Sequence, residues 1–142
     1  MRLSTKGRYG TRAMLDLAIR GNGKAIPAKD IAKSQNIPIR YLEQILNTLR
    51  KVGLVKSVRG INGGYSLAKK PDEIKILDIV TTLEGSLAPV KCVDDTGECE
   101  RTEHCTTRAL WSELKDKIEE TLSAATLADL CVEERKKAAE KL

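Results

Sequence analysis

The 142 residues suffice for one domain, or for a small domain with an appendage. Hydrophobic residues make up 41% of the chain, and with one Trp, three Tyr and no Phe the core must be largely aliphatic. No apolar run approaches the roughly 20 residues that a membrane span requires. The basic start, MRLSTKGRYG, lacks the apolar centre of a signal peptide. We therefore expect a cytoplasmic protein that does not associate with membranes.

The net charge differs sharply between the two halves of the chain. Residues 1–75 carry 16 Lys and Arg against 5 Asp and Glu, a net charge of +11. Residues 76–142 carry 9 against 15, a net charge of −6. A strongly basic half attracts polyanions, above all nucleic acid. Charge alone is equally compatible with a basic surface that only contacts solvent.

Helix signals dominate the basic half. Ser4 can cap a helix that runs to the GNGK turn at residues 21–24. Pro27 opens a short helix, AKDIAKSQ, which stops at Asn36. Pro38 opens another, IRYLEQILNTLRKVG, which Gly53 closes. A helix, a tight turn and a second helix within about 25 residues form a helix-turn-helix.

The last of these helices has two distinct faces. Its core-facing stripe has apolar side chains at helical spacing: Leu42, Ile45, Leu46 and Leu49. A second stripe has fork-shaped or planar polar side chains that can address base edges in a major groove: Arg40, Glu43, Gln44 and Asn47. We add the neighbouring Tyr41 to these candidate DNA-binding residues. An ordinary solvated helix face is the alternative explanation for the second stripe.

A hairpin is predicted directly after this helix. Two β-prone runs, Leu54–Val58 and Tyr65–Ala68, flank the sequence RGINGG, whose three glycines free the turn sterically. A hairpin in this position is the wing of a winged helix. Arg59 stands at its edge, where an arginine can enter a narrow minor groove of enhanced negative potential. Helices, wing and charge together favour DNA binding.

The acidic half begins with a short helix and ends with two more. DEIKILDIVTTLEG reads as a brief extended piece and a helix that ends at Gly85. TRALWSELKDKIEETLSAA reads as a long helix with an apolar stripe at i+4 spacing: Leu110, Leu114, Ile118 and Leu122, widened by Trp111 and Ala125. We interpret it as a dimerisation helix, with packing onto its own domain as the alternative. Thr126 can cap a last segment, LADLCVEERKKAAEKL.

Three of the four cysteines lie in the polar stretch between these helices. Cys92, Cys99 and Cys105 are separated by six and five residues in a segment that we expect to be a loop. Clustered thiols in a reducing cytoplasm indicate metal or redox chemistry. Soft thiolates suit an iron–sulfur cluster or zinc, although zinc sites usually show tighter C-x2-4-C pairs. Three reduced thiols without a ligand are the remaining alternative.

Three thiols leave a fourth ligand position open. The candidates are His104, Cys131, an acidic residue or a group from a partner subunit. His104 is the only histidine, but because it adjoins Cys105 it reaches the same metal only with a bent backbone. Cys131 lies on the apolar side of the last helix, where a small packed residue is expected.

Taken together, these segments resemble the IscR-like iron–sulfur cluster regulators, within the superfamily that also holds NsrR and CymR. The resemblance covers about residues 1–130, from MRLSTKGRYG through YLEQIL, LRKVGLV, SVRG-INGGY and the cysteines to RALW. It implies a homodimeric winged-helix transcription factor that binds a palindromic operator and governs genes of iron–sulfur cluster biogenesis. It also implies Cys92, Cys99 and Cys105 as ligands of a cluster, [2Fe–2S] with [4Fe–4S] as the alternative. Glu43 and Gln44 are then readers in the recognition helix, and Arg59 is the minor-groove residue.

The sequence departs from the family pattern at the fourth ligand. IscR has a histidine three residues after its third cysteine, where this chain has Arg108. NsrR can use an acidic residue near the N-terminus of the other subunit, where this chain has Gly7, Arg8 and Tyr9. A weak fourth ligand would suit a sensor, because the cluster would then be lost or attacked easily.

We therefore predict a mainly α fold with a small β-hairpin. Residues 1–84 form a winged helix-turn-helix domain, 85–106 a cysteine-bearing loop, and 107–142 a dimerisation helix with a tail. Two alternatives share this fold: a nitric-oxide- or redox-sensing repressor, and a repressor regulated by zinc or thiols. An enzyme is not expected, because the chain lacks C-x-x-C, a glycine-rich phosphate loop and a base–nucleophile arrangement.

Overall fold

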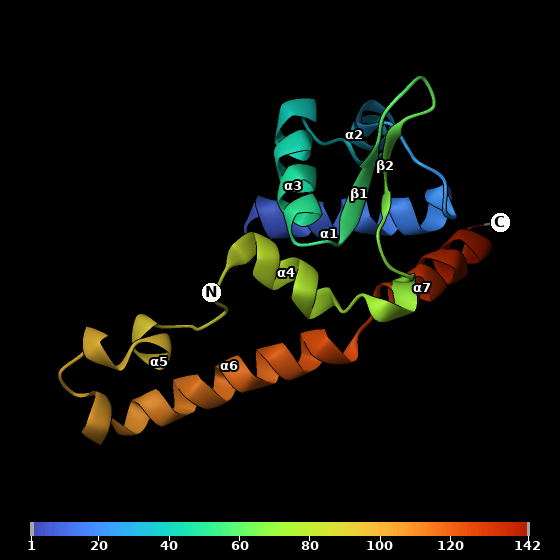
Figure 1. Ribbon diagram of the computed structural model, residues 1–142. Helices are drawn as coiled ribbons and strands as arrows, with labels where there is room; N and C mark the ends of the chain where they lie inside the picture. Colours follow the sequence, from blue (N-terminus) through green and yellow to red (C-terminus); the bar gives the residue numbers. More distant parts are fainter. Residues whose placement is uncertain (1, 142) are drawn as a thin grey trace.

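The computed structural model describes residues 2–141, with the side chains of Glu98 and Thr102 excepted. Helix α1 (Thr5–Asp16) lies in the middle of the N-terminal part (Figure 1). Helices α2 (Ala28–Gln35) and α3 (Ile39–Lys51) and the hairpin of β1 (Val55–Val58) and β2 (Gly64–Leu67) lie on one side of it. On the other side lie α4 (Ile76–Glu84) and α7 (Leu127–Glu140). The expected winged helix-turn-helix is confirmed.

Helix α3 inserts its apolar stripe into a single aliphatic core. Four side chains at positions i, i+3, i+4 and i+7 are completely buried there: Leu42, Ile45, Leu46 and Leu49. Each buried side chain of this size stabilises the fold by about 1.5–3 kcal/mol relative to exposure. The core fixes which face of α3 points outward, and this is the face that carries the predicted DNA-binding residues.

Helix α1 ends in a widened turn that an ion pair stabilises. Its last predicted residues form a π-helical turn (Leu17–Gly21), and the left-handed backbone of Asn22 stops it. The carboxylate of Asp16 is buried and accepts hydrogen bonds of 2.8 Å from both Nε and Nη2 of Arg20. Because the buried charge is paired, its desolvation cost is offset.

The wing is attached to the chain that precedes α2. Strands β1 and β2 pair in antiparallel register, with Val55 opposite Leu67 and Val58 opposite Gly64. Ile26 and Tyr65 exchange both backbone hydrogen bonds at 2.8 Å, which adds a third short segment to the hairpin. A Cβ at Gly64 would overlap the carbonyl of Ile26, so this close approach requires glycine.

The cysteine segment contains more regular structure than the loop that was predicted. Helix α5 (Lys91–Asp94) and two 3₁₀ turns (Thr96–Glu98 and Thr102–His104) lie between α4 and α6. Asp95 caps the second of these elements by accepting a 2.9 Å hydrogen bond from the backbone N–H of Gly97. Short polar side chains thus fold the backbone locally, which hydrophobic periodicity cannot reveal.

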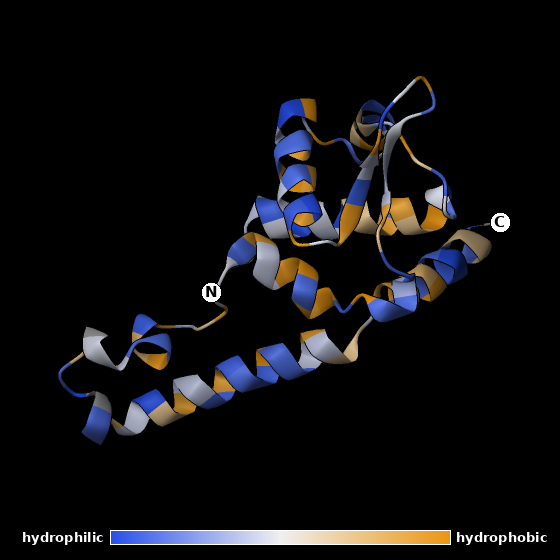
Figure 2. Ribbon diagram, in the orientation of Figure 1, coloured by the Kyte–Doolittle hydropathy of each residue, from blue (hydrophilic) through white to orange (hydrophobic). Residues whose placement is uncertain are grey.

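Helix α6 (Thr106–Ala124) extends away from the N-terminal part and carries the cysteine segment at its outer end (Figure 1). None of its described residues is fully buried. At its inner end Leu122 packs against the core, whereas Leu110 and Trp111 at its outer end are 56% and 36% exposed. Apolar positions recur along its otherwise hydrophilic surface (Figure 2). The helix therefore packs on its own domain at one end and presents apolar side chains at the other.

Helix α7 returns to the N-terminal part. Thr126 caps it as predicted, in a capping box in which its hydroxyl accepts from the N–H of Asp129 and the Asp129 carboxylate accepts from its N–H. Leu127 is fully buried, and Cys131 is 3% exposed, which confirms Cys131 as a packed residue. No helix in the described part of the chain is both long and apolar enough to cross a membrane.

Replacing Ile45 by Ala is expected to lower the free energy of unfolding by about 2–5 kcal/mol, because it opens a cavity in the core. The adjacent Gln44→Ala removes an exposed side chain and should change it by less than about 0.5 kcal/mol. Urea unfolding followed by far-UV circular dichroism measures both. Equal losses for the two variants would contradict the facial assignment of α3.

Candidate nucleic-acid interface and cysteine segment

The outer face of α3 holds the predicted base-reading residues. Arg40, Glu43 and Gln44 are exposed, and Asn47 is half-buried. The side-chain oxygen of Asn47 accepts a 2.6 Å hydrogen bond from Nη2 of Arg50. The structure therefore places the four side chains together on the face opposite the core, with Asn47 already engaged within the helix.

Tyr41 is half-buried against α1. Its hydroxyl lies 3.2 Å from Oγ1 of Thr5, and its ring meets that of Tyr9 edge-on with centroids 5.9 Å apart. The guanidinium of Arg12 lies 5.3 Å from the centre of the Tyr9 ring. Tyr41 thus braces the start of α3 on α1. Sequence reasoning grouped Tyr41 with the DNA-binding residues but missed this contact with Thr5.

The turn of the wing projects from the N-terminal part, beyond the ends of β1 and β2 (Figure 1). Arg59 is exposed at its start, and the N–H of Gly63 donates a 3.0 Å hydrogen bond to the carbonyl of Gly60. Gly60 has a φ of 113°, which favours glycine. Ile61 at the tip is fully exposed. The geometry leaves the Arg59 side chain available to a partner that contacts both α3 and the wing.

The three cysteines lie on successive parts of one segment. Cys92 is half-buried on α5, Cys99 is exposed at the end of a 3₁₀ turn, and Cys105 is half-buried at the start of α6. Within the described residues, no three side chains of His, Cys, Asp and Glu are close enough together to share a metal ion. The three thiols share one short segment but, in the described part of the chain, do not form a preassembled metal site.

Cys105 has a thiol whose surroundings favour the thiolate. The Thr107 hydroxyl, 3.1 Å from its sulfur, is the largest cause that lowers its pKa, followed by the backbone N–H of Arg108. Thiolates are the form that binds metals and reacts as nucleophiles. By contrast, burial raises the pKa of Cys131, which keeps that thiol protonated.

Two cations of α6 hold the cysteine segment in place. Arg108 donates a 2.9 Å hydrogen bond from Nε to the carbonyl of Cys92. Lys115 lies 3.0 Å from a carboxylate oxygen of Asp94, and Ser86 donates a further bond to that carboxylate. These hydrogen bonds, from Ser86 first and Lys115 next, lower the pKa of Asp94. Sequence reasoning noted Arg108 only as a departure from the family pattern and missed this anchoring.

His104 lies in the same segment, directly before Cys105. It ends a 3₁₀ turn, and its N–H donates a 3.0 Å hydrogen bond to the carbonyl of Arg101. Its side chain is exposed and lines a shallow cavity together with Glu100 and Cys105.

The set of donor side chains fits an iron–sulfur cluster held by thiolates. Three thiols stand on one anchored segment, and the environment of Cys105 favours its ionised form.

Comparison with known proteins gives a consistent result. The family model Rrf2, described as an iron-dependent transcriptional regulator, matches residues 3–133. The protein rrf2 of Nitratidesulfovibrio vulgaris is 42% identical over 92% of this chain and 87% of its own length. The regulator IscR of Erwinia tasmaniensis is 43% identical over 92% of this chain and 78% of its length. The regulator CymR of Bacillus subtilis is 42% identical over 92% and 89%.

Solved structures agree with these relatives. The structure of IscR from T. potens superposes with a TM-score of 0.78 at 41% identity, covering 97% of this chain and 90% of that one. CymR, the global cysteine regulator of B. subtilis, superposes with a TM-score of 0.77 at 40% identity, covering 93% and 97%. The relatives are regulators, in agreement with the expectation that the chain is not an enzyme. The chain belongs to the Rrf2 family of transcriptional regulators.

Proposed function

We propose that this regulator binds DNA as a homodimer and that an iron–sulfur cluster held by Cys92, Cys99 and Cys105 controls its operator binding. The observation that carries the proposal is the position of the three thiols. They stand on the one segment that joins the N-terminal part, through α4, to the long helix α6. By analogy with the IscR relatives, we propose genes of iron–sulfur cluster biogenesis as its targets and the cytoplasm as its location.

We assign DNA reading to α3 and the wing. Arg40, Glu43 and Gln44 would address base edges in the major groove, because their side chains are exposed on the face opposite the core. Arg59 would enter the adjacent minor groove. Asn47 and Tyr41 would support the edge of this surface. The net charge of +11 on residues 1–75 supplies attraction to phosphates.

We assign dimerisation to α6. Its outer end presents Leu110 and Trp111 to solvent, and a second copy would cover them. A two-fold dimer places two α3 helices so that they meet half-sites about one DNA turn apart, which requires a palindromic operator. Because spacing of the half-sites is fixed, a small movement between the two α3 helices changes affinity.

The cluster would make the thiol segment sensitive to iron supply or oxidants. [2Fe–2S] is the form expected from the IscR relatives, and [4Fe–4S] is the alternative. In this chain Arg108 and Lys115 hold α5 against α6 through hydrogen bonds. The part of the segment that carries Cys92 would therefore stay in place while the rest of the segment folds around a cluster. His104 remains the candidate fourth ligand within the same segment. The hydrogen bond to the Arg101 carbonyl is made by the backbone N–H of His104 and does not involve the imidazole. The imidazole could therefore rotate toward a cluster.

A regulator that uses the same thiols without a cluster is the second candidate. The observation that favours it is the Thr107 hydroxyl 3.1 Å from the Cys105 sulfur, which lowers the pKa of that thiol and so suits direct oxidation or zinc binding. The similarity to CymR, a cysteine regulator, points the same way.

Anaerobic purification followed by iron, sulfide and zinc analysis distinguishes the two. About two irons and two sulfides per chain with visible absorption bands are expected for a [2Fe–2S] cluster. Zinc, or thiols without metal, would instead favour the second candidate and leave the assignment of DNA binding untouched.

Replacing Cys92, Cys99 or Cys105 by Ser is expected to abolish the visible absorption, because each loss removes one of three thiolate ligands. Cys131→Ser is the matched control: it changes a buried thiol outside the segment and should keep the iron content, although it lowers stability. Absorption spectra and iron content of anaerobic protein measure this. Retention of the full spectrum by any of the three segment variants would remove that cysteine from the ligand set.

Replacing Arg59 by Ala is expected to weaken operator binding by about 1–3 kcal/mol, most strongly at sites with a narrow A/T minor groove. The DNA is a duplex selected from a random-sequence pool by the wild-type protein, and fluorescence anisotropy at fixed salt measures affinity. Arg135→Ala on α7 removes the same exposed charge at a distance from the wing and serves as the control. An equal loss for both variants would show that Arg59 contributes only general charge.

A further inference from the structure

We propose that Glu84 is the positioning residue through which the cysteine segment acts on α3. The inference rests on the proposed function, because it takes the segment to be the regulatory part of the molecule. Glu84 is the last residue of α4, and Gly85 with a φ of 81° ends that helix directly before the segment. The carboxylate therefore lies at the joint between the segment and the N-terminal part.

Glu84 caps α1 from a distance of 80 residues along the chain. Its Oε1 accepts hydrogen bonds from the N–H and the hydroxyl of Ser4, at 2.9 and 2.5 Å, and from the N–H of Gly7, at 3.0 Å. The Ser4 side chain does not cap the helix itself. A carboxylate at this end also interacts favourably with the helix dipole. The start of α1 thus depends on a side chain supplied by α4.

The absence of a side chain at Gly7 makes this contact possible. A Cβ there would overlap the Glu84 carboxylate. A few residues further, a Cβ at Gly10 would overlap the side chain of Leu83. The side chains of Glu84 and Leu83 therefore occupy the space that the two glycines leave open on α1. A shift at the end of α4 is transmitted to α1 because the side chains of Glu84 and Leu83 lie directly against the backbone of α1.

The chain that leaves Glu84 is hydrogen-bonded to the thiol segment through Ser86. Two residues beyond it, Ser86 donates from its hydroxyl to the carboxylate of Asp94 and accepts a 3.1 Å bond from the N–H of Ala88. Asp94 lies two residues after Cys92 and is held to α6 by Lys115. Rearrangement of the backbone at Cys92 must therefore disturb Asp94, Ser86 and the start of the chain that leaves Glu84.

Contacts in the other direction connect Glu84 to the DNA-reading helix. The turn of α1 that Glu84 caps contains Thr5, whose hydroxyl lies 3.2 Å from that of Tyr41. One turn later, the ring of Tyr9 packs edge-on against the ring of Tyr41. Tyr41 stands near the start of α3, between the exposed Arg40 and the buried Leu42. The same two turns of α1 thus contribute to the orientation of α3.

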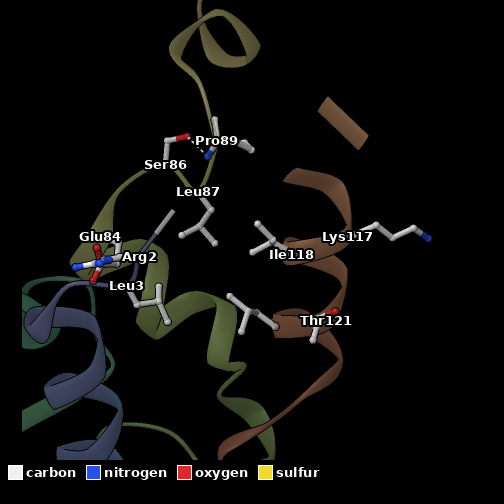
Figure 3. Close-up of a pocket in the computed structure, with 11 residues that line it drawn as sticks. Arg2, Leu3, Glu84, Ser86, Leu87, Pro89, Lys117, Ile118 and Thr121 are labelled. Atoms are coloured by element: carbon white, nitrogen blue, oxygen red, sulfur yellow. Dashed lines mark hydrogen bonds between the residues drawn. The ribbon is translucent and has the colours of Figure 1, made fainter. Parts of the chain in front are cut away.

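A cavity of about 570 Å³ beside Glu84 gives the joint room to move. Its wall is formed by Arg2 and Leu3 before α1, by the chain from Ser86 to Pro89, and by Ile118 and Thr121 of α6 (Figure 3). Leu87 and Ile118 point into it from opposite sides. Closing or opening of this space changes where the chain after Glu84 lies. The proposal requires two positions of the segment, with DNA affinity following the one that its ligand favours.

The test is a comparison of DNA affinity in two states of the segment. Full-length protein is reconstituted anaerobically with iron and sulfide, and part of it is then stripped by chelation. Each form is titrated against the selected duplex, and the ratio of the two dissociation constants is the measured coupling, about 5–150-fold in typical allosteric proteins. For Glu84→Ala we expect this ratio to fall to within about twofold of one, with the iron content unchanged.

Gly7→Ala is a second variant that disrupts the same contact. It displaces the flexible carboxylate while favouring the helix by about 0.5–1 kcal/mol, so it remains folded. The same loss of the ratio is expected. Asp129→Ala is the matched control, because it removes a helix-capping carboxylate from α7, outside the route to α3. It should lower the melting temperature and keep the wild-type ratio.

The outcomes separate this inference from the proposed function. A wild-type ratio of one would contradict regulation by the segment altogether. A wild-type ratio well above one that Glu84→Ala and Gly7→Ala both retain would overturn the role of Glu84 alone. If Asp129→Ala also lost the ratio, the effect of Glu84→Ala would be explained by a general loss of stability, and the inference would be overturned. Loss in the two joint variants with retention in the control supports the inference.

Discussion

The close contact between α1 and α4 is the constraint on which both halves of the molecule depend. Glu84 supplies the cap that the start of α1 lacks, and Gly7 and Gly10 leave room for the side chains of Glu84 and Leu83. Helix α1 in turn supports α3 through the ring of Tyr9, while α4 leads directly into the cysteine segment. One helix pair therefore supports the proposed DNA-binding surface and the segment that carries the thiols. A rigid contact of this kind transmits displacement, whereas a flexible linker would absorb it.

The architecture of the N-terminal part was predictable because its signals are local. The stripe of α3 repeats every three or four residues, and its four members are all fully buried. Asparagine and glycine in the left-handed backbone region mark the ends of α2 and α3, at Asn36 and Gly53. The cap at Thr126 and the packing of Cys131 also follow from neighbours in the sequence. Each of these features is set by side chains that stand close together along the chain.

The contacts that organise the candidate site were not predictable, because they join residues far apart in the sequence. Ser4 and Glu84 are separated by 80 positions, and Cys92 and Arg108 by 16. Neither residue type indicates its partner. A glutamate at the end of a helix is usually a surface residue, and the sequence predicts that the side chain of Ser4 caps α1 by itself. The short elements of the cysteine segment were missed for a related reason. Asp95 and Asp94 hold them through individual hydrogen bonds rather than through a periodic apolar face.

The unequal charge of the two halves acquires a physical meaning once the fold is known. In Figure 1, α3 and the wing lie on one side of α1, and α6 with the cysteine segment lies beyond the other side. The basic half, at +11, faces the proposed DNA, and the acidic half, at −6, carries the thiols. Like charges repel, so phosphates are expected to be steered toward the basic half and away from the acidic half, and salt screens this effect over about 8–10 Å. In the proposed mechanism a regulatory signal at the thiols reaches the DNA through packed contacts, and the contact between α4 and α1 is one such route.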